Sequence, residues 1–199
     1  GVDDDGNGYV DDFAGWDFVA LGAGAAAGED AHDEDNDPND YGGHGTAVAG
    51  IIGAIAGNGI GLAGVVPNVR MMSLRIGWLQ SGGLPPAGLI DMSYAAAAIR
   101  YATRMGVAVI NCSWQSQNTG GLDAAVSAAT RAGMIIVNAS GNGGTPFTYL
   151  GQREDVISVT ATDSTDAVWS GAVRGPWVDL AAAGVIVAAA VAEVQPEAI

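Results

Sequence analysis

Cysteine is nearly absent from this chain, whose 199 residues include only Cys112. An intramolecular disulfide is therefore excluded, and the domain must rely on apolar packing for its stability. Cys112 follows an apolar segment, residues 107–110, and has no neighbour that would activate a thiol. We therefore expect this cysteine to be buried and unreactive.

Basic residues are also scarce, with 7 Lys and Arg against 22 Asp and Glu, which gives a formal net charge of −15. Such a surface repels nucleic-acid phosphates, so we expect no nucleic-acid partner. No apolar run reaches the ~20 residues that would cross a bilayer, so we expect no membrane insertion. The acidic balance is typical of a secreted, calcium-binding or salt-adapted protein, and a solvated acidic surface without special function is the alternative.

Apolar residues make up 49% of the chain, enough for one domain with a sizeable core. Their spacing predicts alternating helices and strands. We expect helices over residues 91–105 and 122–132, and strands over residues 69–76, 107–111, 134–139, 156–160 and 177–181. This order predicts an α/β fold with a parallel sheet, helices on both faces and right-handed crossovers. Functional residues in such sheets follow the carboxyl ends of strands, where Ser113 and Asn142 stand.

His44 lies between two glycines, just before apolar residues at helical spacing. Glycine allows a sharp turn and lets another chain approach the imidazole closely. Thr46 is suited to starting the helix. The pattern predicts an imidazole presented at the start of a helix, which suits a general base near neutral pH. A structural histidine in a glycine-rich turn is the alternative.

The stretch from Gly43 to Gly50, GHGTAVAG, resembles the histidine motif of the subtilisin-like serine proteases, and further motifs occur in the family's order. They are GWDFV (15–19), DPND (37–40), GVVPNV (64–69), VINCSW (109–114), ASGN (139–142), VISV (156–159), ATD (161–163) and VDLAA (178–182) with Gly184. The ordered set covers nearly the whole chain. Residues 1–199 therefore resemble one incomplete peptidase S8 (subtilisin-like) domain, a three-layer α/β sandwich with a mostly parallel sheet, incomplete at both ends.

The resemblance implies a serine endopeptidase that hydrolyses polypeptides through an acyl-enzyme, with His44 as general base and the Asn142 amide donating to the oxyanion. It implies that Ser113, Trp114 and Gln115 bind extended substrate and wall the specificity pocket. Ala139, Ser140 and Gly141 would line the back of that pocket, and residues 79–83 would form the opposing substrate strand. Small lining residues favour large apolar substrate side chains. Gln115, where the family often has Gly, would narrow the pocket or alter backbone pairing.

The family also implies secretion and a propeptide partner, but two of its motifs are missing. Neither the D-[ST]-G strand of the catalytic aspartate nor the G-T-S-M-A segment of the nucleophile occurs. We interpret the chain as a fragment cut at both ends and expect it to be inactive alone. Because the aspartate strand is central in the family's sheet, buried ladder groups would be unpaired at a cost of ~1–3 kcal/mol each. We therefore expect the isolated chain to be unstable or aggregation-prone.

Three loops are candidate calcium sites, because clustered carboxylates repel one another without a cation. The first resembles the start of a calcium loop but has Ala14 at the last ligand position, so a full EF-hand is not supported. The resemblance implies the second, before His44, and the third, after the histidine helix. The candidate ligands are Asp3, Asp5, Asn7 and Asp11; Asp33, Asp35, Asp37 and Asp40; and Asn58. A solvated loop is the alternative at each place, and we expect no organic cofactor.

Other functions are less well supported. Ser113 lacks the G-x-S-x-G surroundings of an exposed nucleophile. His32 has no second ligand at zinc spacing. No G-x-G-x-x-G or Walker loop follows a strand, which argues against nucleotide binding. The main alternative to a protease fragment is a catalytically inactive, calcium-stabilised subtilase-like module that has a structural role or binds peptides.

Overall fold

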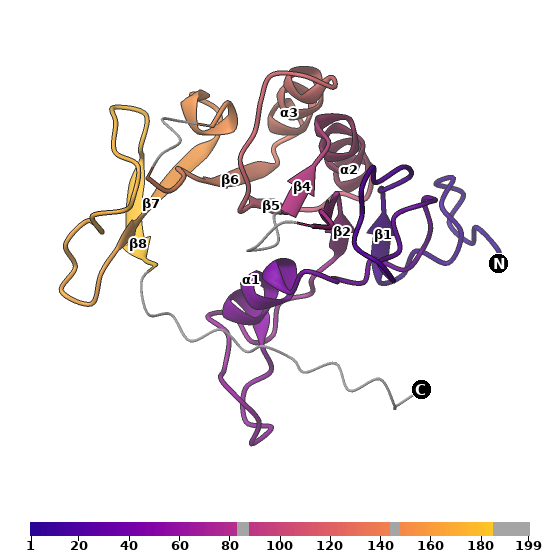
Figure 1. Cartoon of the computed structure of the whole chain (residues 1–199), viewed down its shortest axis with the longest axis horizontal. Coiled ribbons are helices and arrows are strands. Elements are labelled where there is room, and N and C mark those ends of the chain that lie inside the picture. The colour runs from indigo at the N-terminus through magenta and orange to yellow at the C-terminus, as the bar shows by residue number, and fades with distance from the viewer. Residues whose placement is uncertain (83–87, 144–147, 185–199) are drawn as a thin grey trace. The chain divides into compact units, whose positions relative to one another are not determined.

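The computed structural model describes residues 1–82, 88–143 and 148–184. Within the described residues the chain divides into two compact units, residues 1–89 and residues 90–184 (Figure 1). The expectation of one domain over residues 1–199 stays a prediction. All the ladders with an assigned register are parallel, so the α/β class with a mostly parallel sheet is confirmed.

The first unit has a two-stranded parallel sheet, in which β1 (Gly15–Asp17) pairs with β2 (Ser73–Arg75). Gly15 has a φ of 125°, and a Cβ atom there would lie 1.8 Å from the carbonyl oxygen of Ser73. Only glycine therefore allows these two strands to pair so closely. The strand expected over residues 69–76 is shorter, and a further sheet of two short strands, β3 (Gly77–Leu79) and β4 (Gly88–Ile90), was not expected.

Helix α1 (His44–Gly53) confirms the predicted helix but begins differently. Gly43 is the N-cap, with a φ of 76° that glycine adopts easily, and it makes no side-chain cap. Thr46 lies inside the first turn and is not the N-cap, but its backbone N–H and hydroxyl both donate to Asp40 at the helix start. The cap comes instead from Asp40, as described below.

The second unit contains a four-stranded parallel sheet in the order β5 (Val109–Cys112), β6 (Ile135–Ala139), β7 (Ile157–Thr162) and β8 (Leu180–Ala183). Helix α2 (Met92–Arg104) precedes β5 and helix α3 (Leu122–Arg131) precedes β6, and a short 3-10 helix, η1 (Leu150–Gln152), precedes β7. Gly106 and Gly133, both with positive φ, follow the two long helices, as predicted. The predicted elements are confirmed in type and order, but β5 begins two residues later and β8 three residues later than expected.

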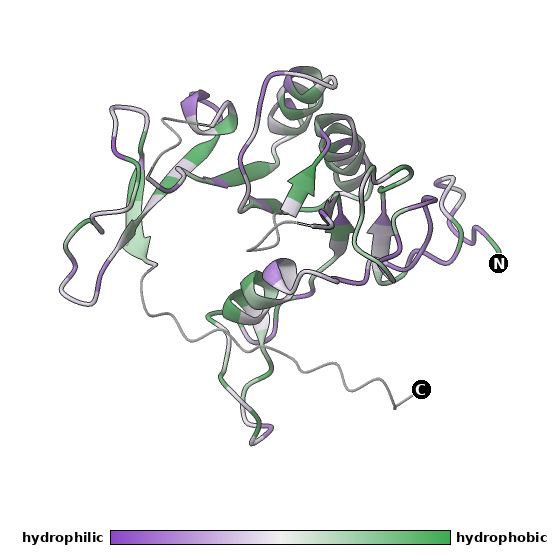
Figure 2. Ribbon diagram, viewed as in Figure 1, coloured by the Kyte–Doolittle hydropathy of each residue, from purple (hydrophilic) through white to green (hydrophobic). Residues whose placement is uncertain are grey.

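The core of the second unit lies under the helices. Helix α2 packs against α3, and α3 packs on β6 (Figure 1). Along β6 the buried residues Ile136 and Asn138 alternate with the exposed residues Ile135 and Ala139. One face of this sheet is therefore covered within the unit, while the other face exposes apolar side chains; Figure 2 shows their hydropathy. The unit also holds a buried polar residue, Asn138, in an otherwise apolar strand.

Candidate active site and peptide-binding segments

His44 is exposed at the first position of α1, as the sequence predicted for a general base. Asp40 fixes this helix start. Its carboxylate accepts hydrogen bonds from the backbone N–H groups of Gly42, Gly43 and Thr46 and from the Thr46 hydroxyl, at 2.6–3.1 Å. Burial would raise the pKa of Asp40, but these hydrogen bonds outweigh it and hold the pKa below its usual value. Asp40 was predicted as a calcium ligand; the structure shows it as the cap of the helix that presents His44.

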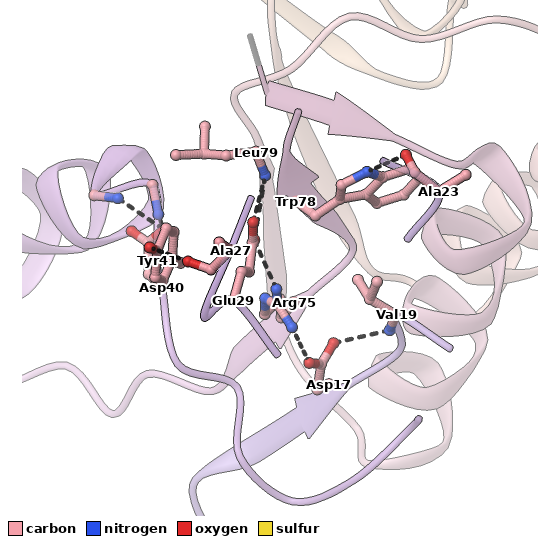
Figure 3. Close-up of polar contacts among 12 residues, drawn as sticks. Asp17, Val19, Ala23, Ala27, Glu29, Asp40, Tyr41, Arg75, Trp78 and Leu79 are labelled. Carbon is pink, nitrogen blue, oxygen red and sulfur yellow. Dashed lines mark hydrogen bonds and ion pairs between the residues drawn. The ribbon is translucent and has the colours of Figure 1, made fainter. Parts of the chain in front are cut away.

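A buried ion cluster supports the same unit (Figure 3). The Arg75 guanidinium, at the end of β2, pairs with Asp17 at the end of β1 and with Glu29, whose carboxylate lies 2.8 Å away. Burial raises the pKa of Asp17 to about 6, even though Arg75 and the backbone N–H of Val19 donate to its carboxylate. Burial would lower the pKa of Arg75, but the two carboxylates raise it. The cluster places two carboxylates against one guanidinium in a dry site.

The segment expected to form a substrate strand, residues 79–83, is already paired along one edge within the described part, residues 79–82. The Leu79 N–H donates to Glu29 at 2.9 Å, and the Leu79 carbonyl accepts from Ala26 at 2.9 Å. The Ser81 N–H donates to the carbonyl of Gly24 at 2.8 Å. In an extended strand these groups of residues 79 and 81 face the same edge. A peptide that added to this edge would have to displace Gly24–Ala26; residue 83 lies outside the described residues.

The predicted pocket segments lie at the carboxyl ends of adjacent strands in the second unit. Ser113–Gln115 follows β5, and Ala139–Gly141 closes and follows β6, with Cys112 opposite Asn138 in the ladder. Ser113 and Trp114 are half-buried, Gln115 is exposed and Ser140 is buried. The structure thus brings the two predicted pocket walls together, as expected for this class of sheet.

Asn142 is exposed in the turn that follows, where Gly141 has a φ of 106°. This turn is held to residues 171–173. Asn142 forms an isolated bridge with Ala172, the Gly143 N–H donates to Gly171, and the Val173 N–H donates to Gly141 at 3.1 Å. An amide side chain on a backbone fixed from both sides is a suitable donor to a developing negative charge.

Sequence reasoning missed Asn138, which joins the two pocket walls. Its side chain is fully buried, and its Nδ2 donates to the carbonyls of Cys112 at 2.8 Å and Trp114 at 3.3 Å. Its Oδ1 accepts from the Thr148 hydroxyl at 2.6 Å. The signal in the sequence was an asparagine in the apolar run IIVNA, because a buried amide must find partners.

The candidate calcium ligands do not converge on a binding site. Asp3 accepts backbone N–H groups of its own loop, and the Asn58 oxygen accepts from Ile60 at 3.0 Å. Asp35 accepts from the N–H of Asp37. Within the ranges that the structure describes, no group of three or more His, Cys, Asp or Glu side chains is arranged to hold a metal ion. The residues do not fit a calcium ion in this conformation, so calcium binding stays a prediction.

Cys112 is buried, and burial raises the pKa of its thiol to about 12. The thiolate is therefore scarce at neutral pH, in agreement with the unreactive cysteine that the sequence predicts. No helix of the described residues is long and apolar enough to cross a membrane.

The structure thus combines a parallel α/β fold with an imidazole at a helix start and an amide beyond a strand end. The subtilase family model matches residues 24–197, so the chain belongs to the subtilase family. It is 39% identical over 160 residues to a thermophilic serine proteinase of Bacillus sp. (strain AK1). It is 33% identical over 172 residues to thermitase of Thermoactinomyces vulgaris.

These alignments cover 79% and 85% of this chain but only 38% and 54% of the two relatives, so the chain spans about half of their length or less. Among solved structures, a protease from Pseudoalteromonas arctica superposes with a TM-score of 0.70 at 24% identity. That match covers 85% of this chain and 56% of the other. At this identity it shows the subtilisin-like fold alone.

Proposed function

We propose that the chain is part of a serine endopeptidase that cleaves polypeptides through an acyl-enzyme, with the nucleophilic serine and the catalytic aspartate supplied from outside residues 1–199. The observation that carries the proposal is the position of His44, exposed as the first residue of a capped helix inside an ordered match to the subtilase family. On this proposal the chain alone does not hydrolyse peptides.

In the proposed mechanism, the neutral His44 imidazole takes the proton of the serine hydroxyl as the hydroxyl oxygen attacks the peptide carbonyl. The Asn142 amide donates a hydrogen bond to the oxyanion of the tetrahedral intermediate. His44 then gives the proton to the leaving amine as the peptide bond breaks and the acyl-enzyme forms. A water molecule, deprotonated by His44, attacks the acyl-enzyme, and the serine leaves with the proton that His44 returns. Ser113–Gln115 and Ala139–Gly141 hold the substrate on both sides of the residue before the cleaved bond.

The first experiment is to sequence the coding DNA on both sides of codons 1 and 199. An in-frame D-[ST]-G upstream and G-T-S-M-A downstream would support the proposal. A start codon and a stop codon at these ends would refute it, since the chain would then lack a nucleophile. The protein expressed from the complete reading frame should cleave a blocked fluorogenic peptide, and His44→Ala should abolish this cleavage.

Asn142→Ala provides a second test, because it removes one donor and leaves the triad. We expect kcat to fall by about 10²–10³ while KM changes little, a range that is known from subtilisin itself and not worked out from this chain. Equal activity of Asn142→Ala and the unchanged protein would remove Asn142 from the mechanism.

We also propose secretion and a propeptide partner, supported by family membership alone. Calcium is the weakest of these proposals, because the described loops do not form a donor set. If calcium stabilises this protein through the first candidate loop, millimolar CaCl₂ should raise the melting temperature, and the triple variant Asp3→Asn/Asp5→Asn/Asp11→Asn should remove that rise. An unchanged melting temperature would refute a calcium requirement.

The alternative is a subtilase-like module that binds peptides without cleaving them. The backbone edge of Leu79 and Ser81, which already pairs with residues 24–26 and Glu29, does not distinguish a protease from a peptide-binding module. Both functions require a peptide in the site. Binding of a labelled peptide by the complete protein without hydrolysis would favour the alternative.

A further inference from the structure

We propose that Asn138 is a positioning residue that sets the spacing of the two pocket walls and thereby the selectivity for the substrate side chain before the cleaved bond. This inference rests on the proposed function of the same site. It goes beyond the family match because it concerns a side chain that does not itself face the substrate.

Asn138 lies at the end of the paired part of β5 and β6. The β5–β6 ladder pairs residues 109–112 with residues 135–138, and Cys112 opposite Asn138 is its last pair. Beyond this pair the β5–β6 ladder assigns no further partners, and the backbone N–H of Ser140 donates to Val159 of β7 at 2.8 Å. The Asn138 side chain connects the second wall to the first through its hydrogen bonds to Cys112 and Trp114.

The hydrogen-bond partners of the Asn138 side chain fix the orientation of its amide. Its Nδ2 has two hydrogens and faces two carbonyl oxygens, those of Cys112 and Trp114. Its Oδ1 faces a hydroxyl donor, Thr148. The opposite orientation would set an oxygen against two carbonyl oxygens, so the surroundings determine which end of the amide binds Trp114.

The residues that hydrogen-bond to Asn138 are themselves held in place. Thr148 is buried, and its hydroxyl accepts from the backbone N–H of Gly151 at 3.0 Å. The wall that contains Trp114 is also tied to the residues around η1. The Ser116 carbonyl accepts from Tyr149 at 3.0 Å, and the Ser116 hydroxyl accepts from Leu150 at 2.8 Å. A fully satisfied buried network of this kind holds one geometry, because each broken bond would leave a polar group unpaired in the core.

The consequence concerns the substrate. The Trp114 carbonyl belongs to the first wall, and Asn138 directly precedes Ala139 of the second wall. A shift of Trp114 relative to Ala139 changes the width of the space between the walls. Width discriminates most strongly between a large and a small substrate side chain, whereas the groups that perform the chemistry lie outside the network.

The test compares two blocked fluorogenic tetrapeptides, with Phe or Ala before the cleaved bond, using the protein from the complete reading frame. In Asn138→Asp the carboxylate cannot donate to the Cys112 and Trp114 carbonyls. We expect the ratio of kcat/KM for Phe over Ala to change by about tenfold, through KM, as fits the net loss of one to two hydrogen bonds. The kcat for the Ala peptide should stay within about threefold, because the reacting groups are untouched.

Thr148→Val is the milder variant, because it keeps the shape of the side chain and leaves both donor hydrogens of Asn138 in place, while it removes the donor to Oδ1 and the acceptor of the Gly151 N–H. We expect a smaller change in the same ratio and in the same direction, and this variant decides the question if Asn138→Asp does not fold. Ser158→Ala is the matched control. Ser158 lies opposite Asn138 in the β6–β7 ladder, is equally buried, and has a hydroxyl without a hydrogen-bond partner among the described residues. Its ratio should equal that of the unchanged protein.

Loss of thermal stability with an unchanged Phe-to-Ala ratio would overturn the inference and leave Asn138 a structural residue, with the proposed function intact. Equal loss of kcat for both peptides would also overturn it. If the unchanged protein cleaves neither peptide, the proposed function fails and this inference fails with it.

Discussion

Replacement of Arg75 by Met is the sharpest test of how the first unit is held together. The side chains of the cluster are 7% exposed for Arg75, 0% for Asp17 and 2% for Glu29, so water cannot compensate a lost partner. Removing one member of a buried ion pair typically costs ~3–5 kcal/mol. Here one substitution leaves two carboxylates unpaired, so we expect Arg75→Met to lower the free energy of unfolding by about 4 kcal/mol at pH 7.

The loss should depend on pH. Burial raises the pKa of Asp17 and Arg75 opposes that rise, so without Arg75 the Asp17 carboxylate takes up a proton more readily. The destabilisation at pH 5 should therefore be clearly smaller than at pH 7. Neutralising the carboxylates in the same protein, as Asp17→Asn/Glu29→Gln/Arg75→Met, should recover much of the loss at pH 7.

The assay is urea unfolding followed by circular dichroism, with the protein from the complete reading frame. Arg100→Met is the control, because Arg100 is an exposed residue of α2, and we expect it to change stability by no more than about 0.5 kcal/mol. A loss below about 1 kcal/mol for Arg75→Met, or an equal loss at pH 5 and pH 7, would refute the argument from unpaired buried charge.

Four further outcomes are expected. The pKa of Asp17 is about 6 when folded and 3.8 for an unperturbed aspartate, so the contribution of Asp17 to folding stability is fully present below about pH 4 and is lost as the pH rises through about 6. This loss of stability is at most ~3 kcal/mol. Asp17→Asn should remove the loss from a plot of unfolding free energy against pH. Asp40→Ala should cost about 1 kcal/mol at pH 7, measured by urea unfolding, through loss of the helix cap. Glu29→Ala, but not Glu34→Ala at an exposed position of the same loop, should speed hydrogen exchange of the Ser81 amide. The isolated chain 1–199 should not melt cooperatively and reversibly in calorimetry.

The regular elements of the second unit could be predicted from the sequence because their signals are local. Helices α2 and α3 have apolar residues at helical spacing and end before glycines, and the strands between them are short apolar runs. The position of His44 could be predicted for the same reason. The strands β3 and β4 have three residues each, too few for an alternation to be recognised.

The buried ion cluster and the contacts of Asn138 could not be predicted, because they join distant residues. Arg75 is separated from Asp17 by 58 positions and from Glu29 by 46, and nothing near any of them announces the pairing. Asp40 was interpreted as a calcium ligand. A carboxylate can bind either a cation or the N–H groups at a helix N-terminus, and only the backbone geometry distinguishes these two roles. Asn138 gave a signal, a polar residue in an apolar strand, but not the identity of its partners.

A common arrangement connects these unpredicted residues. Three of the segments with a proposed role are held by a buried or half-buried polar side chain outside the segment: the start of the His44 helix by Asp40, Leu79 by Glu29, and Trp114 by Asn138. Such contacts fix a backbone more exactly than apolar packing, because a hydrogen bond has a narrow range of distances and directions. The position of each held segment and the stability of the fold therefore depend on the same atoms. Substitutions at these three anchors should therefore lower stability and alter the segment they hold, whereas substitutions of the exposed residues His44 and Asn142 should change the chemistry and leave the fold intact.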